Sequence, residues 1–133
     1  MYSAEIHNEK REVTVLVIDD NQSIRSLLAR VLRGSYKVLL ADSVESALSI
    51  IEHARPSVVI TDYEMPGRNG IEGAKAIRRA IPHVTIIMLS GSATDDLAQE
   101  ALRQGVDECA HKPFDIRRIP DMVERHLAMM GAV

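Results

Sequence analysis

The sequence predicts one α/β domain in which a doubly wound, five-stranded parallel sheet is covered by five helices on its two faces. Two patterns support this prediction. Short apolar runs rich in β-branched residues alternate with amphipathic helical segments along most of the chain, and these runs are apolar throughout. Strands of that kind are buried on both faces, as in parallel sheets whose strands alternate with helices. The length of 133 residues fits a single domain.

The five expected strands are short, and polar or charged residues follow most of them. The first is the run Val-Thr-Val-Leu-Val-Ile, which ends at a pair of aspartates. The last is less apolar and is the weakest of the five. Together the expected strands cover residues 13–18, 36–41, 57–61, 84–89 and 106–111.

Apolar residues recur at helical spacing after each strand, which predicts helices that carry residues 24–32, 44–51, 71–77, 97–102 and 116–127. Ser43 is a good N-cap for the second helix, and Gly34 and Gly105 end the first and the fourth. Pro120 falls inside the last expected helix and removes a backbone donor. That helix must therefore either start late or have a distorted first turn.

The composition excludes several classes of protein. The net charge of −3 offers no electrostatic reason to bind nucleic acid or an anionic membrane. No apolar run approaches the roughly 18 residues that a membrane span requires, and the polar N-terminus lacks a signal peptide. The single cysteine, Cys109, rules out an internal disulfide and suits a reducing compartment. We therefore expect a cytoplasmic protein with an N-terminal extension (1–12), one domain (13–128) and a C-terminal tail (129–133).

Residues with chemical function follow four of the five expected strands. Asp19 and Asp20 follow the first strand, Asp62 the third, Ser90 the fourth and Lys112 the fifth. In an open parallel sheet the functional site lies at the carboxyl ends of the strands. The sequence therefore predicts that three carboxylates, a hydroxyl and an ammonium group converge on one edge of the sheet.

Such a set of groups suits phosphoryl chemistry with a divalent cation. Two carboxylates about 4 Å apart repel by roughly 4 kcal/mol at an effective dielectric constant of about 20, and Mg²⁺ relieves that repulsion while keeping positions open for phosphate oxygens. Lys112 and Ser90 can meet a phosphoryl group with a positive charge and a hydroxyl donor. Asp62, central in the sheet, is the best candidate for a nucleophilic carboxylate.

Four motifs in the sequence make a family resemblance plain. They are Val-Ile-Asp-Asp at 17–20, Ile-Thr-Asp-Tyr-Glu-Met-Pro-Gly at 60–67, Met-Leu-Ser-Gly at 88–91 and His-Lys-Pro-Phe at 111–114. In this order they resemble the receiver domain of two-component response regulators, especially the single-domain receivers of chemotaxis type. The resemblance extends from about residue 13 to residue 126 and implies a flavodoxin-like fold.

The resemblance also implies a role for each site residue. Asp62 would be the phosphoacceptor. Asp20, Asp62 and the backbone carbonyl of Glu64 would hold Mg²⁺, with Asp19 acting mostly through water. Ser90 would be the switch hydroxyl, and Lys112 would pair with the phosphoryl group. The peptide bond before Pro113 is commonly cis in this family.

The resemblance further implies partners. A sensor histidine kinase or a histidine phosphotransfer protein would donate the phosphoryl group from phosphohistidine. The output would be contact with a downstream protein, without nucleic acid or membrane, from a monomer or weak dimer with no fused output domain. The protein would not be an enzyme beyond its own phosphorylation and dephosphorylation. Asn21, Gln22 and Arg25 are expected to be free for docking the donor.

The sequence departs from the family pattern at Cys109, and two alternative functions remain open. Cys109 stands three residues before Lys112, where receivers usually carry Tyr or Phe, so the usual movement of an aromatic ring is in doubt. A haloacid-dehalogenase-type phosphatase uses the same groups, but places its nucleophile on the first strand. A pseudo-receiver that only binds partners is the second alternative. A flavin carrier is excluded, because the Asp-Asp pair after the first strand would repel a phosphate.

Overall fold

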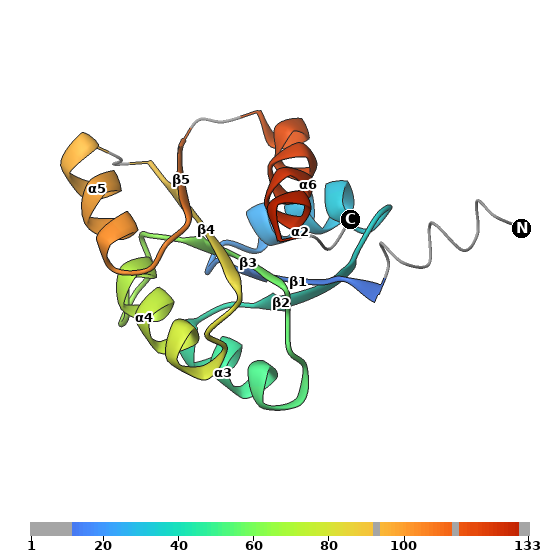
Figure 1. Cartoon of the computed structure of the whole chain (residues 1–133), viewed down its shortest axis with the longest axis horizontal. Coiled ribbons are helices and arrows are strands. Elements are labelled where there is room, and N and C mark those ends of the chain that lie inside the picture. The colour runs from blue at the N-terminus through green and yellow to red at the C-terminus, as the bar shows by residue number, and fades with distance from the viewer. Residues whose placement is uncertain (1–11, 92–93, 113–114, 131–133) are drawn as a thin grey trace, which may run out of the picture.

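The computed structural model describes residues 12–91, 94–112 and 115–130, and Figure 1 shows their arrangement. Five parallel strands form one sheet in the order β2-β1-β3-β4-β5. Their bounds are β1 Thr14–Ile18, β2 Lys37–Ala41, β3 Val58–Asp62, β4 Thr85–Ser90 and β5 Glu108–His111. The doubly wound parallel sheet that the sequence predicts is confirmed.

The helices lie on both faces of this sheet (Figure 1). The α-helices are α2 Gln22–Leu32, α3 Val44–His53, α4 Gly70–Ala80, α5 Asp95–Arg103 and α6 Ile119–Met129, and a short 3₁₀ turn, η1, covers Ile116–Arg118. Helices α2 and α6 cover one face, and α3, α4 and α5 cover the other. None of the helices in the described part of the chain is both long and apolar enough to span a bilayer.

The two faces of the sheet bury separate sets of side chains, because neighbouring residues of a strand point to opposite faces. On one face Leu16, Val59 and Met88 pack against residues of α3, α4 and α5. On the other face Val17 and Ile60 pack against residues of α2 and α6. The central strand β3 is buried along its whole length, so its last residue, Asp62, is held on a rigid element.

Local sequence explains where the helices begin. Asn21 accepts hydrogen bonds from the backbone N–H groups of the first turn of α2, and Ser43 forms a capping box at the start of α3, as expected. The last helix starts late: η1 comes first, and α6 begins at Ile119 with Pro120 in its first turn. Proline is tolerated there because the first N–H groups of a helix have no partner within the helix.

Helix α4 packs unusually close to the end of β3. A Cβ atom added to Gly70 would lie 2.6 Å from the carbonyl oxygen of Asp62 and 2.8 Å from the Cα atom of Tyr63. The N–H group of Gly70 also donates to the carbonyl oxygen of Tyr63 at 3.0 Å. Glycine is therefore required at the point where α4 meets the backbone of the site.

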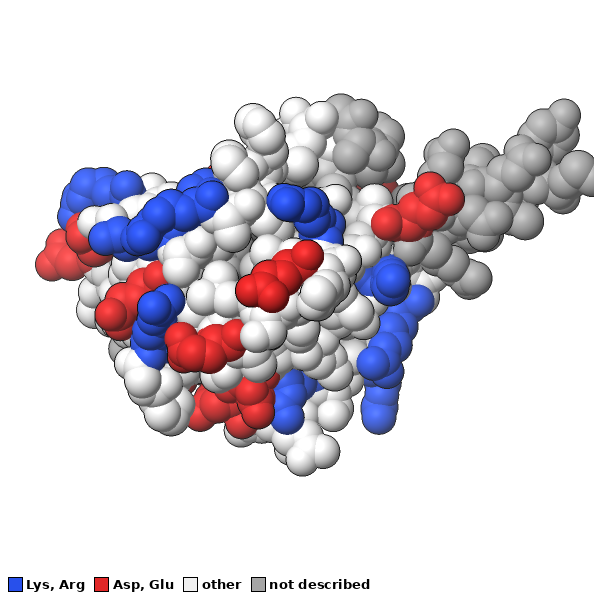
Figure 2. Space-filling view, turned by 90° about the horizontal axis from the view of Figure 1, so that it is seen from below, with Lys and Arg blue, Asp and Glu red and all other residues white. Residues whose placement is uncertain are grey.

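The charges on the side of α3 and α4 are mixed in sign. Figure 2 shows Lys and Arg side chains next to Asp and Glu side chains over this face. Arg68, just before α4, forms an ion pair at 3.4 Å with Glu45 of α3, and both side chains are exposed. An exposed pair of this kind contributes at most about 1 kcal/mol to stability.

Candidate functional site

The carboxyl ends of β1, β3, β4 and β5 bring the predicted residues together. Asp19 and Asp20 follow β1, Asp62 is the last residue of β3, Ser90 is the last residue of β4 and Lys112 follows β5. Three backbone hydrogen bonds extend the sheet pairing past the strand ends: the N–H groups of Asp19, Tyr63 and Lys112 donate across to β2, β4 and β4, respectively. The sheet itself thus sets the position of the site.

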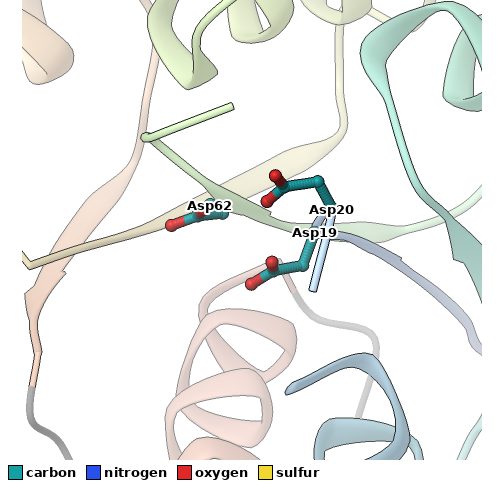
Figure 3. Close-up of side chains that lie close together, drawn as sticks. All are labelled: Asp19, Asp20 and Asp62. Carbon is teal, nitrogen blue, oxygen red and sulfur yellow. The ribbon is translucent and has the colours of Figure 1, made fainter. Parts of the chain in front are cut away.

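Three carboxylates form the centre of this edge. One carboxylate oxygen from each of Asp19, Asp20 and Asp62 lies within 4.8 Å of the others. In Figure 3 the side chains of Asp19 and Asp20, from the end of β1, point toward the same side as Asp62 on β3. Asp19 and Asp62 are buried, with 2% and 4% of their surface exposed, whereas Asp20 is exposed.

Burial and crowding disfavour the charged forms of the two buried acids. Burial is the main cause that raises the pKa of Asp19, and the charges of Asp62 and Asp20 raise it further. Burial also raises the pKa of Asp62, against the opposing effect of Lys112. These carboxylates are therefore held together at an energetic cost that a cation would remove.

Lys112 provides part of the positive charge that these carboxylates need. Its Nζ atom donates to Oδ1 of Asp62 at 2.8 Å, and its side chain is 28% exposed. Burial alone would lower the pKa of Lys112, but the hydrogen bond to Asp62 and the charges of Asp62, Asp19 and Glu64 raise it. One ammonium group thus offsets only part of the negative charge of three carboxylates.

Asp19 is fixed in place by its backbone and by one carboxylate oxygen. Its N–H group donates to Ala41 at 3.1 Å, its carbonyl oxygen accepts from Arg25 at 2.7 Å, and its Oδ1 accepts from the N–H group of Asn21 at 2.9 Å. Its buried Oδ2 has no hydrogen-bond partner among the described residues. An unsatisfied carboxylate oxygen in a residue that lies beside two other carboxylates fits a hard divalent cation such as Mg²⁺.

These contacts change the interpretation of the first turn of α2. Asn21 and Arg25 were expected to be free for docking, but Asn21 caps α2 and Arg25 holds the carbonyl group of Asp19. Arg25 therefore helps to hold the backbone of Asp19, and with it the acid cluster, in place. The sequence missed these contacts because helical spacing shows which side chains leave the core, and not which of them turn back to the backbone. Docking of the donor by these residues stays a prediction.

The side chain of Glu64 makes a contact that the sequence did not indicate. Its Oε2 accepts from the hydroxyl group of Ser90 at 2.8 Å, and its Oε1 accepts from the N–H group of Gly91 at 3.1 Å. The resemblance assigns a role to the carbonyl group of Glu64 only. The one sequence signal for the contact was an acidic residue two positions after Asp62.

Cys109 lies on β5 beside Met88 of β4 and packs against the core on the side of α3, α4 and α5. Burial raises the pKa of its thiol, and the charge of Glu64 adds to this effect. The cysteine thus favours its neutral form. Pro113 and the expected cis peptide bond lie outside the described residues.

Sequence comparisons place this site in a known family. Residues 15–124 match the model of the response regulator receiver domain. The chain is 34% identical over 113 residues to the response regulator protein FleR of Pseudomonas aeruginosa, covering 84% of this chain but only 24% of that protein. It is 32% identical to the sporulation initiation phosphotransferase F of Bacillus subtilis over 92% of this chain and 96% of that one.

Solved structures agree with the sequence comparisons. A chemotaxis response regulator, CheY4 of Vibrio cholerae, superposes with a TM-score of 0.80 at 30% identity, covering 85% of this chain and 97% of that chain. A receiver domain protein from Clostridium thermocellum gives 0.83 at 28% identity, covering 90% and 98%. From the family match, the relatives and the acid cluster together, the chain belongs to the receiver domains of two-component response regulators.

Proposed function

We propose that Asp62 accepts a phosphoryl group from a phosphohistidine donor in the presence of Mg²⁺, and that the phosphorylated domain signals by binding another protein. The observation that supports this most strongly is the placement of Asp62. It ends the buried central strand, its carboxylate lies with those of Asp19 and Asp20, and Lys112 donates to it at 2.8 Å. An attacking carboxylate needs this proximity of positive charge and metal ligands.

Each residue of the site has a proposed role. Asp20, Asp62 and the carbonyl group of Glu64 would bind Mg²⁺ directly, and Asp19 would act mostly through water. The ion would neutralise the charge of the acids and of the incoming phosphoryl oxygens. Lys112 would then turn from Asp62 toward the phosphoryl group, and Ser90 would donate to one of its oxygens.

The partners are proposed from the names of the relatives. One relative is a histidine kinase of Formosa agariphila, 28% identical over 91% of this chain and 9% of that protein. The name of the Bacillus subtilis relative describes a phosphotransferase. A sensor histidine kinase or a histidine phosphotransfer protein is therefore the expected donor, and a cytoplasmic protein the expected target.

Receiver domains are signalling phosphoacceptors and not enzymes in the usual sense, which favours this function over that of a phosphatase. Self-catalysed phosphorylation and dephosphorylation would be the only chemistry of the chain. As a monomer or weak dimer, it would present its signal on its own surface. A neighbouring structure, the beryllofluoride-activated NtrC4 receiver domain, is described as a dimer; it is 27% identical, with a TM-score of 0.81, and covers 87% of this chain and 97% of that chain.

The test is intact mass spectrometry after incubation with acetyl phosphate and Mg²⁺. We expect about one phosphate on the wild-type protein and none on Asp62→Asn, since the amide cannot form the acyl phosphate. Asp96→Asn, on the exposed first turn of α5, is a matched control that should be labelled like the wild type. Label that persists in Asp62→Asn would refute the assignment. An unlabelled wild type would indicate a pseudo-receiver, and continuous turnover of acetyl phosphate without label would indicate a phosphatase.

A further inference from the structure

The carboxylate of Glu64 binds the end of β4 with both of its oxygens. One oxygen accepts from the hydroxyl group of Ser90 at 2.8 Å and the other from the N–H group of Gly91 at 3.1 Å. Ser90 is fully buried, so this hydroxyl group is poorly accessible to water. Hydrogen bonds to an ionised carboxylate are about twice as strong as those between neutral groups. We call these two hydrogen bonds the Glu64 clamp.

The two donors in the clamp lie next to the proposed phosphoacceptor. Ser90 directly follows Leu89, which pairs with Asp62 in the sheet. The carbonyl oxygen of Ser90 accepts from the N–H group of Lys112 at 2.8 Å, and the Nζ atom of Lys112 reaches Asp62. The clamp and the lysine thus both lie at the end of β4, the strand that pairs with Asp62.

Glu64 and Lys112 also flank Gly91 closely. A Cβ atom added to Gly91 would lie 3.9 Å from Oε1 of Glu64 and 3.9 Å from the side chain of Lys112. The charge of Glu64 contributes to the raised pKa values of Asp62 and Lys112. The carboxylate of Glu64 is therefore part of the electrostatic environment in which a phosphoryl group on Asp62 would have to bind.

We infer that Glu64 is an internal competitor for the phosphoryl site. In the resting state its carboxylate takes the hydroxyl group of Ser90 and the N–H group of Gly91, two donors at the end of the strand next to Asp62. This inference rests on the proposed function, because it assumes that Asp62 is the phosphoacceptor. A carboxylate and a phosphoryl group are both anions with two or more acceptor oxygens, so they cannot share these two donors.

The competition has a direct consequence for the switch. Phosphorylation must displace Glu64 from Ser90 and Gly91, and loss of the phosphoryl group lets Glu64 bind them again. A ligand shifts an equilibrium only by its differential affinity for the two states, so the clamp biases the domain toward the resting state. Removal of the carboxylate should therefore strengthen binding of any phosphoryl-like anion at Asp62.

The test uses beryllofluoride, a stable analogue of the phosphoryl group, titrated at saturating Mg²⁺ into the wild type, Glu64→Gln and Glu64→Ala. Loss of a charge-assisted pair of hydrogen bonds predicts about tenfold tighter binding by Glu64→Ala, with Glu64→Gln between it and the wild type. Both variants keep the backbone carbonyl group that is proposed to bind Mg²⁺. Glu52→Gln, on the exposed side of α3, removes the same charge elsewhere and should bind like the wild type.

A second measurement tests the clamp without any phosphoryl group. The amide proton resonance of Gly91, recorded without metal or beryllofluoride, should move upfield in both Glu64 variants and stay in place in Glu52→Gln. Unchanged or weaker beryllofluoride binding by both Glu64 variants would overturn the inference, as would an unmoved Gly91 resonance. Failure of the wild-type protein to bind beryllofluoride or to be labelled at Asp62 would instead refute the proposed function, and the Gly91 resonance would still report on the clamp.

Discussion

At the amino ends of β4 and β5, one guanidinium group satisfies several polar groups at once, whereas at the carboxyl ends of the strands three carboxylates crowd together around one ammonium group. Arg78, on α4, donates to the carbonyl oxygen of Val84 just before β4 and to that of Gly105 before β5, the latter at 2.5 Å. It also pairs with Asp107 at 2.8 Å, and the same oxygen of Asp107 accepts from Ile86.

The difference between the two ends shows how one sheet separates stability from function. At the amino ends, opposite charges are paired and backbone groups are satisfied, so these contacts stabilise the fold. At the carboxyl ends, Asp19 and Asp62 are buried near each other, and Oδ2 of Asp19 lacks a hydrogen-bond partner in the described part of the chain. That arrangement is unfavourable without a cation, which fits the Mg²⁺ site proposed above.

The largest effect on stability is expected at the amino ends. Arg78→Met removes the guanidinium donor of three carbonyl groups, those of Pro82, Val84 and Gly105, and leaves the carboxylate of Asp107 with the N–H group of Ile86 but no positive charge. We therefore expect a loss of about 2–3 kcal/mol in the free energy of unfolding, measured by urea titration. Arg79→Met, at the exposed neighbouring position, should change it by no more than about 0.5 kcal/mol. Acetyl phosphate labelling of the folded Arg78 variant should match the wild type. A loss of labelling would contradict the separation of the two ends.

Asp19→Asn is expected to change the free energy of unfolding by a smaller amount and in the opposite direction, toward higher stability. Because the pKa of Asp19 is raised in the folded state, its ionised form is less favourable there than in the unfolded chain. This penalty is absent below the unfolded pKa of about 4, grows as the pH rises above it, and is complete once the pH exceeds the raised value. The metal-free variant should therefore melt about 4 °C higher than the wild type at pH 7, which corresponds to about 1 kcal/mol.

The same experiment has two controls. The difference in melting temperature should shrink as the pH falls toward 3, where Asp19 is protonated in both states. Saturating Mg²⁺ should stabilise the wild type more than the variant and so reduce the difference as well. A variant that is less stable than the wild type at pH 7 without metal would show that Asp19 stabilises the fold.

The smallest effect is expected at Arg25, which connects the acid cluster to α2. Without its hydrogen bond to the carbonyl group of Asp19, the carboxylate of Asp19 is less well oriented, so Arg25→Ala should weaken Mg²⁺ binding about threefold by calorimetric titration. Gln22→Ala, on the same turn of α2, should leave Mg²⁺ affinity unchanged. Equal affinities for Arg25→Ala and the wild type would show that this hydrogen bond does not orient the acid cluster.

Much of the fold could be predicted from the sequence because its strands are buried on both faces. An apolar run such as residues 57–61 is continuous and lacks the spacing of an amphipathic helix, and the residue that follows such a run marks the edge of the site. Asp19, Asp20, Asp62, Ser90 and Lys112 could be brought together by this reasoning, and the structure places them on one edge. Their individual roles remain predictions.

What could not be predicted depends on side-chain direction in loops. The clamp of Glu64 requires that the chain after Asp62 turn toward β4, and no periodic pattern describes that turn. The contacts of Arg25 and Asn21 were missed for a similar reason, since both side chains turn back to nearby backbone atoms. The late start of α6 was one of two possibilities that Pro120 left open, and only the geometry of η1 decides between them.

The close contact between Gly70 and the end of β3 leaves the backbone of Asp62 little room to move toward α4. Helix α4 packs directly against the backbone of Asp62. A Cβ atom added at Gly70 would lie only 2.6 Å from the carbonyl oxygen of Asp62. On the other side, the same carbon at Gly91 would meet nothing closer than 3.9 Å. We therefore expect a change at Asp62 to displace the end of β4 more readily than α4. In hydrogen exchange, the amide of Gly70 should remain equally protected in both states of the switch while that of Gly91 changes.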